Sequence, residues 1–195
     1  MANPNHLAQL HEAIASSQQR SDRSSPLLVG ADLAGADLRG ADLTRVSLMA
    51  ADLRGARLHD ADLTGANLIA ANLQGADLRG TVLNRAQLSR ANLSRADLRD
   101  ASLCQAALDA ASLNGVTLIG ASLYQASLVG AICSDAYLTQ VNAIEANFGC
   151  CDLRNTDLRW SDLRQTNFAA AQLEGACFAG ANLQRANLPS SWSFE

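Results

Sequence analysis

From Leu28 to Leu188 a side chain of one kind returns at every fifth position of the chain, without insertion or deletion. Of these 33 central positions, 28 are Leu and three are Phe, and only Cys133 and Ala143 depart. A second position, two residues before each centre, is Ala in 24 of the 33 repeats. The residue between the two is usually Asp, Asn or Ser, and the two residues after the centre vary. The chain is therefore built from five-residue units with two apolar positions each.

A period of five fits neither regular secondary structure, since a helix repeats every 3.6 residues and a strand every two. Every centre can return to the interior only if the chain turns once per five residues. Four such turns close a square coil of 20 residues, and coils stacked at strand spacing lie about 4.8 Å apart. The pattern thus predicts an all-β solenoid over residues 26–189, with about eight coils and a length on the order of 40 Å.

The core of this solenoid follows from the same count. Each centre points to the axis and stacks on the centre twenty residues away, and burying one Leu contributes roughly 1.5–3 kcal/mol before entropy is counted. The Ala two residues earlier also points inward and must be small, because four larger side chains per coil already fill the interior. The predicted core includes the stack Leu38, Leu58, Leu78 and Leu98 and the aromatic centres Phe148, Phe168 and Phe178.

The five-residue unit has its most typical residue at every position in Ala-Asp-Leu-Arg-Gly at 36–40 and again at 76–80. It resembles the repeat A(D/N)LXX of the pentapeptide-repeat family, and the resemblance covers about five-sixths of the chain. It implies a right-handed quadrilateral β-helix that binds other molecules without catalysis. Proteins similar to this one are abundant in cyanobacteria, where some affect cell differentiation. Others in the family bind DNA gyrase through an acidic rod of duplex size, and confer quinolone resistance.

Solenoids need caps at both ends. Residues 1–25 are predicted to form an N-terminal cap and linker, with Asn3 as N-cap and Pro4 opening an amphipathic helix that continues to about Ser17. A helix lying on a membrane surface is the alternative for this segment, but its polar face has no Lys or Arg. At the other end, residues 190–195 are expected to fold Trp192 and Phe194 over the last coil.

Counting by twenty sorts the outward residues into four faces. One face carries an arginine column beside an aspartate column, and we select from it Arg39, Arg79, Arg99, Arg159, Asp77, Asp97 and Tyr137 as candidate interaction residues. The first interpretation is a solvated ladder whose charges neutralise one another, since each exposed pair contributes little. The second is a polar recognition strip for a partner protein.

The opposite face is the least charged. Val29, Met49 and Ile69 follow its first three centres and are expected to form an exposed apolar strip on consecutive coils. Contiguous apolar patches on a monomer often mark contact surfaces. The strip therefore suggests self-association, and we expect a monomer or a weak homodimer. Ordinary scattered exposure, or cover by the N-terminal helix, are the alternatives.

The stretch 132–168 is the least regular part of the repeat. It contains both exceptional centres, Cys133 and Ala143, together with the aromatic residues Tyr137 and Trp160. One interpretation is local repacking of the core, because Ala in place of Leu leaves a void unless neighbours fill it. The other is a partner-binding site, because exposed Tyr and Trp are favoured at interfaces.

The amino-acid composition narrows the range of functions that fit the chain. The net charge is −4 and Lys is absent, so direct nucleic-acid binding is not expected, since it needs clustered basic residues. No signal peptide and no membrane span are recognised, which predicts a cytoplasmic protein with five reduced cysteines. Cys151 should point inward and Cys150 outward. No pattern indicates a catalytic group, a cofactor or a metal site, because the three His and five Cys are scattered.

Two functions remain. The first is a non-enzymatic scaffold or regulatory module that binds a protein whose identity the sequence does not give. The second is a DNA mimic that binds DNA gyrase, which fits this chain less well because Arg nearly balances Asp and Glu.

Overall fold

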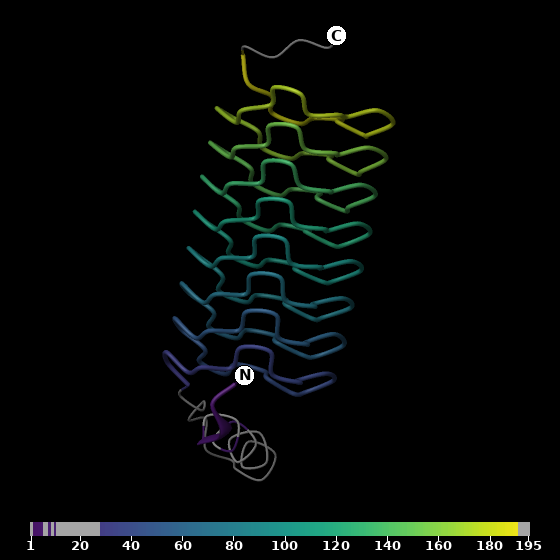
Figure 1. The fold of residues 1–195 in the computed structure, drawn as a ribbon. Helices are drawn as coiled ribbons and strands as arrows, with labels where there is room; N and C mark the ends of the chain where they lie inside the picture. Colours follow the sequence, from purple (N-terminus) through teal and green to yellow (C-terminus); the bar gives the residue numbers. More distant parts are fainter. Residues whose placement is uncertain (1, 6–7, 9, 11–27, 191–195) are drawn as a thin grey trace.

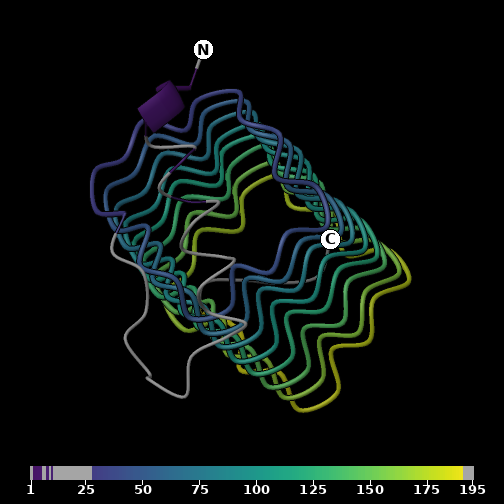
Figure 2. The same ribbon diagram turned by 90° about the horizontal axis from the view of Figure 1, so that it is seen from below.

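The computed structural model of the chain describes residues 2–5, 8, 10 and 28–190. Residues 28–190 form a single stack of coils that rises from one end of the molecule to the other (Figure 1). Seen along the axis, successive coils lie over one another and outline a four-sided tube (Figure 2). The five-residue pattern therefore folds as the sequence predicts, as a β-solenoid.

Parallel pairing between coils has a constant register of twenty residues. The pairs are isolated bridges, one on each side of each coil, and they run without interruption from Asp32↔Asp52 to Asn167↔Asn187. In each bridge region two backbone bonds join neighbouring coils, such as Leu33 N to Asp52 O at 2.8 Å and Asp52 N to Ala31 O at 2.8 Å. Each side of a coil thus contributes one bridged residue, and the chain turns before a longer strand can form.

A β-turn follows every centre, and this closes the sides of the square. In the first turn, Ala31 N donates to Leu28 O at 3.1 Å. The third residue of the turn has positive φ in every repeat from Gly30 to Arg185, as type II turns require. Gly occupies twelve of these positions, and twenty carry side chains, among them Arg90 and Trp160. The turn is therefore imposed by the stacking of coils, even where the local residue disfavours it.

The predicted core is confirmed in the described coils. Leu38, Leu58, Leu78 and Leu98 are buried, as are Phe148 and Phe168, whose rings stack with centroids 5.4 Å apart. Phe178 meets Phe168 edge to face at 6.0 Å, but it is only partly buried because it belongs to the last coil. The interior is filled by side chains along the whole axis.

Four polar residues replace the inward Ala, and each is bonded to the backbone. Thr81 Oγ1 donates to Leu58 O at 2.9 Å, and Thr156, Ser161 and Thr166 donate in the same way to the carbonyl of the centre 23 residues earlier. No buried side-chain nitrogen or oxygen in the described chain lacks a hydrogen-bond partner. These hydroxyls fit the core because the geometry of every repeat offers them the same acceptor.

The predicted caps lie mostly outside the described residues. Pro4, Asn5, Ala8 and Leu10 have helical geometry, Asn5 N donates to Asn3 Oδ1 at 3.0 Å, and Leu10 is buried. The extent of the helix to Ser17 and its covering of the first coil stay predictions. The proposed fold-back of residues 191–195 also lies outside the described part.

Candidate functional site

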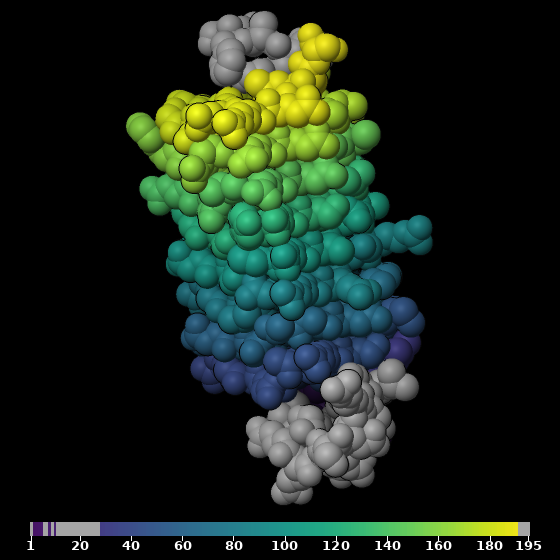
Figure 3. All heavy atoms as spheres, turned by 180° about the vertical axis from the view of Figure 1, so that it is seen from behind, coloured from purple at the N-terminus to yellow at the C-terminus, as the bar shows by residue number. Residues whose placement is uncertain are grey.

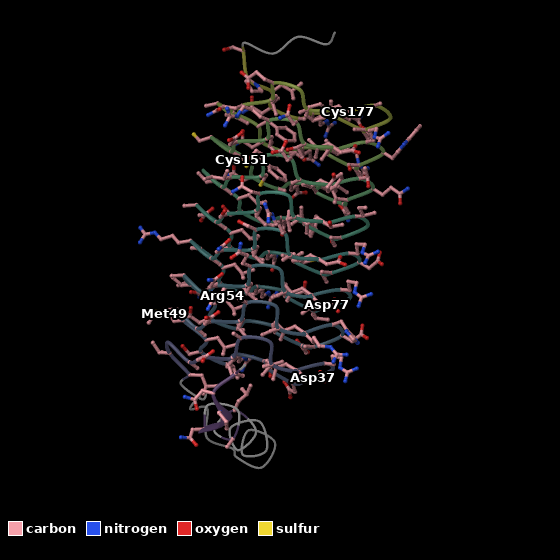
Figure 4. The ribbon with its side chains drawn as sticks, in the orientation of Figure 1. Asp37, Met49, Arg54, Asp77, Cys151 and Cys177 are labelled. Atoms are coloured by element: carbon pink, nitrogen blue, oxygen red, sulfur yellow. The ribbon has the colours of Figure 1, made fainter. Side chains whose placement is uncertain are left out.

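One face of the solenoid concentrates the charged residues, and we call it the charged face. It consists of the residues flanking the centres 38, 58, 78, 98, 118, 138, 158 and 178. In Figure 4, Asp37 and Asp77 lie on this side of the rod, and Met49 lies on the opposite side. Its charged residues are Asp37, Asp60, Asp77, Asp97, Asp100 and Asp157 and, with the opposite sign, Arg39, Arg57, Arg79, Arg99 and Arg159.

The unit of this face is an Asp-Leu-Arg segment in which Asp and Arg flank a buried Leu. Arg79 donates from Nε and Nη2 to the two carboxylate oxygens of Asp77, both at 2.7 Å. Arg39 makes the same paired contact with Asp37, at 2.6 and 2.6 Å. The pairs Arg99–Asp97 and Arg159–Asp157 repeat it. Such two-bond pairs hold the planar guanidinium in one orientation.

The Asp side chain of the unit also fixes the turn that follows. The N–H of Arg159 donates to Asp157 Oδ1 at 3.1 Å, and Arg99 N donates to Asp97 Oδ1 at 3.2 Å. Asp therefore accepts bonds from the backbone and from the side chain of the same residue, two positions later. The repeat itself orients these charges, and no neighbouring coil is needed.

Weaker contacts extend these pairs from one coil to the next. Arg57 Nη1 lies 3.5 Å from Asp37 Oδ2, and His59 Nδ1 lies 3.3 Å from Asp77 Oδ2. Arg79 Nε lies 3.9 Å from Asp97 Oδ2. An open depression in this part of the face is lined by His59, Asp60, Arg79, Gly80, Arg99 and Asp100. Arg159 stands apart from these contacts, because Ile119 and Thr139 occupy its position in the two coils between.

The paired geometry keeps the carboxylates ionised. The hydrogen bonds from Arg39 lower the pKa of Asp37 to about 2. Those from Arg79, with a smaller contribution from His59, hold the pKa of Asp77 well below its usual range. The pKa of Arg79 is raised in turn by Asp77. At neutral pH the face therefore presents fixed charges of alternating sign.

Tyr137 and Trp160 extend the same face toward the C-terminal end of the rod. They are the two most exposed large apolar or aromatic residues in the described chain, with exposed fractions of 53% and 67%. The Trp160 ring lies so close to Gly180, one coil further, that a Cβ at 180 would collide with it. In the sequence Trp160 belongs to the irregular stretch, but counting back from it by twenty leads to Asp100 and Asp60 of the charged face.

The face opposite the charged face has almost no charge, and we call it the uncharged face. It consists of the residues flanking the centres 28, 48, 68, 88, 108, 128, 148 and 168. Val29 and Met49 are exposed by 51% and 38%, whereas Ile69 is partly buried, and the exposed patch is correspondingly smaller than expected. Val129 adds a further exposed residue, at 38%. The only charged residues on this face are Arg90 and Asp109.

The irregular stretch is a repacked core on its inner side. Val141 and Ala143 are both buried. Here the larger residue is at the first inward position, where Ala is usual, and the smaller one is at the centre, where Leu is usual. Thr166 reaches the Ala143 carbonyl from the next coil at 2.8 Å. The bridges Ser122↔Asn142 and Asn142↔Asp162 keep the regular register across the site. The chain therefore passes Ala143 without a bulge, and the larger Val141 lies beside the small centre.

Two cysteines meet inside this stretch. Cys151 Sγ lies 3.5 Å from Cys133 Sγ, and both residues are buried and reduced. The hydrogen bond with Cys151, together with burial, raises the pKa of the Cys133 thiol well above its usual value. Cys150 is exposed, so the predicted opposite directions of Cys150 and Cys151 are confirmed.

The outer surface of the described coils is continuous. On the side seen in Figure 3 the coils form continuous layers without a deep cleft. Among the described residues no group of three or more His, Cys, Asp or Glu is placed to hold a metal ion. The same part of the chain has no helix with the length and apolar character needed to cross a membrane.

Sequence comparison supports the repeat over the whole solenoid. A family model described as pentapeptide repeats matches eight copies within residues 27–65, 61–100, 96–132, 131–168 and 151–188. No curated protein matches the chain significantly.

Solved structures share the fold. HetL from the cyanobacterium Nostoc, a pentapeptide repeat protein involved in the regulation of heterocyst differentiation, is 28% identical with a TM-score of 0.50. The match covers 78% of this chain and 85% of HetL. Two trypsin-treated forms of QnrB1, a plasmid-mediated fluoroquinolone resistance protein, are 19% and 23% identical with TM-scores of 0.64 and 0.65. They cover 81% and 69% of this chain, and 79% and 68% of their own. At this identity QnrB1 supports the fold alone.

Proposed function

Because the chain belongs to the pentapeptide-repeat family, we propose that it is a non-enzymatic scaffold whose charged face docks a partner protein in a regulatory assembly. The observation that carries the proposal is the row of oriented Asp-Leu-Arg pairs at 37–39, 77–79 and 97–99, followed by exposed Tyr137 and Trp160 on the same face. Arg, Tyr and Trp are the residues most enriched where binding energy concentrates in protein interfaces.

The pairs prepare the face for binding. Each guanidinium uses Nε and Nη2 for its own Asp, and its Nη1 makes no hydrogen bond to another described residue in Arg39, Arg79 or Arg99. A partner carboxylate or carbonyl can therefore be bound without breaking the pair. The side chain is already held in position, which lowers the entropy lost on binding.

The regulatory part of the proposal is supported by similarity. HetL, 28% identical to this chain, is involved in the regulation of a differentiation process. A rod that binds partners on the outer surface of its coils suits such a role. The partner fitting this face is a folded protein whose own surface alternates in charge.

Inhibition or protection of DNA gyrase by DNA mimicry is the second candidate. Its basis is the resemblance of the repeat to family members that bind gyrase, and QnrB1, a fluoroquinolone resistance protein, shares the fold. The charge pattern opposes it, because a duplex presents continuous negative charge, whereas the charged face has six carboxylates against five guanidiniums. Partner docking is therefore the better supported function.

Affinity capture with matched variants tests the proposal. The immobilised wild-type protein is compared with Arg79→Glu/Arg99→Glu, which reverses two charges on the charged face. Arg54→Glu/Arg154→Glu is the control, because Arg54 and Arg154 form the same paired contacts with Asp52 and Asp152 on another face. We expect a host protein that binds the wild type and the control but is lost from the charged-face variant. Equal retention on all three columns would contradict the proposal.

The same columns separate the second candidate. Enrichment of gyrase subunits, together with protection of DNA supercoiling from a quinolone by the purified protein, would replace partner docking with gyrase protection. Under the favoured proposal, the protein leaves gyrase activity and its quinolone inhibition unchanged.

A further inference from the structure

The uncharged face has a charge arrangement that is complementary to itself. Arg90 and Asp109 are its only charged residues, they carry opposite signs, and they lie on adjacent coils near the middle of the described rod. Arg90 is exposed and makes no contact with another described residue that would neutralise it. Asp109 accepts bonds at Oδ1 from Ser127 Oγ and Val129 N, which holds the carboxylate in place.

From this we infer that two copies of the chain associate through their uncharged faces as an antiparallel, two-fold symmetric dimer. The two-fold axis lies in the interface, perpendicular to the rods, and passes between the coils of Arg90 and Asp109. Residues related by steps of twenty form a column along the face. The axis places each column of one copy against the same column of the other, in reverse order. Arg90 of each copy then lies against the coil that carries Asp109 of the partner subunit. The dimer therefore contains two Arg90–Asp109 pairs, which the two-fold axis relates to each other.

The apolar residues support the same register. Along the column that follows the centres, the two-fold pairs Val29 with Ala169, Met49 with Gly149, and Ile69 with Val129. The larger side chains of the N-terminal half thus meet small or medium residues of the C-terminal half. Gly149 has no side chain of its own to project toward the exposed Met49 of the partner subunit, and Asn147 and Asn167 lie close beside it. A parallel dimer, with its two-fold axis along the rods, would instead place the Arg90 and Asp109 charges of the two copies on opposite edges of the contact.

The area of the uncharged face limits the affinity of the dimer. A rod about 40 Å long with a side of about 12 Å buries on the order of 500 Å² per copy, near the lower limit for specific interfaces. The dimer is therefore expected to be weak, with a dissociation constant between about 1 and 100 µM. Because the charged face lies on the opposite side of each rod, the dimer displays two charged faces outward and remains able to bind partners.

Sedimentation equilibrium of the full chain in reducing buffer, over a wide protein concentration range, tests the inference. The wild type is expected to dimerise reversibly. Arg90→Glu places two acidic residues together at both symmetric contacts and should weaken the dimer about tenfold or more. Arg90→Glu/Asp109→Arg restores the opposite signs and should recover most of the affinity.

Two further variants make the test independent of the central pair. Arg95→Glu changes the same charge at the equivalent corner of the adjoining face, and Arg95 is also exposed, so it should leave dimerisation unchanged. Met49→Glu adds a buried charge to the proposed contact and should abolish it. Circular dichroism of each variant establishes that it is folded. A monomer at every concentration, or a dimer indifferent to Arg90→Glu and Met49→Glu, would overturn the inference.

Thiol cross-linking decides the orientation. Ala50 lies in the column of the exposed Cys150, and the antiparallel register brings position 50 of one copy opposite Cys150 of the partner subunit. Ala50→Cys treated with a short bismaleimide should therefore give a covalent dimer linked from 50 to 150. Ala70→Cys, which faces Gly130, is the control. Links from 50 to 50, or no link in a sample that sediments as a dimer, would overturn the antiparallel arrangement.

Discussion

His59 and Asp77 join two successive coils across the charged face, with His59 Nδ1 3.3 Å from Asp77 Oδ2. The same carboxylate is held on its own coil by Arg79 at 2.7 Å. Asp77 therefore connects the geometry within one repeat to the stacking of the coils. Through this double contact the charged face, which we propose as the docking surface, also helps to hold the coils together.

Acid should weaken the fold through these carboxylates. Their pKa values are lower in the folded chain than the ordinary value of about 3.9, with that of Asp37 lowered to about 2. A depressed folded pKa contributes stability that is complete above the unfolded pKa and is lost as pH falls through the folded one. We predict that the thermal unfolding midpoint, followed by circular dichroism, declines as pH falls from about 4 to about 2.

Asp77→Asn measures the part played by one carboxylate. At neutral pH it should lower the free energy of unfolding by no more than about 1 kcal/mol, because solvent screens an ion pair at the surface. The variant should also lose less stability than the wild type on acidification. A pH dependence identical to that of the wild type would show that Asp77 is not coupled to folding.

The core should be far less tolerant than the surface. Leu78 is buried and stacks between the coils of Leu58 and Leu98, so Leu78→Ala is expected to cost about 2–5 kcal/mol of unfolding free energy. Leu78→Lys should prevent folding of the middle coils, because the charge has no partner there. The neighbouring change Arg79→Lys should alter stability by less than about 1 kcal/mol. Urea unfolding of the three variants compares these costs directly.

Most of the fold could be predicted from the sequence because one register governs 33 repeats. Once each centre points inward, the stack through Leu78, the burial of Cys151 and the exposure of Cys150 follow from counting. The four faces follow from steps of twenty. What the count does not contain is the conformation of each turn and the direction of each side chain on the surface.

The turn conformation is one such finding. Ala110 has φ of 56°, a region that side chains disfavour, whereas Gly75 adopts 65° with open space around its Cα. We predict that Ala110→Gly stabilises the rod by up to about 1 kcal/mol and that Gly75→Ala destabilises it by a similar amount. Thermal unfolding measures both.

The adjacent residue provides the control for this pair. Ala111 is buried and points inward, so Ala111→Gly should destabilise, because it removes a core methyl group and adds freedom to the unfolded chain. Destabilisation by Ala110→Gly as well would contradict the assignment of strain to the turn.

Side-chain pairing could be predicted only in part. Arginine and aspartate columns imply contacts between coils, but the shortest bonds join Asp and Arg within one repeat, as in Asp157 and Arg159. The period does not reveal this, because the long arginine side chain has several carboxylates within its reach. Thr156 and Thr166 are a similar case: their place in the core is visible in the count, but the carbonyls that accept their hydroxyls are not.

The reactivity of each thiol should follow the solvent exposure of its cysteine. Cys150 and Cys177 are exposed, Cys104 is partly buried beside Ser122 Oγ, and Cys133 and Cys151 are buried. Titration of the native protein with a chromogenic disulfide reagent is predicted to show two fast thiols and a slower third. The last two should react only after denaturation, because the core shields them from the reagent. Five fast thiols in the native protein would contradict the packing of the 132–168 core.

Photo-cross-linking in the native host tests the central claim, that the charged face docks a partner protein, most directly. A photoreactive phenylalanine analogue replaces Tyr137 on the charged face in one variant and Ile132 on the adjoining face in another. The two positions lie on neighbouring sides of the same part of the rod and have exposed fractions of 53% and 44%. If the charged face docks a partner, position 137 gives a specific protein adduct that position 132 does not give. Adducts from position 132 alone, or from neither position, would contradict it.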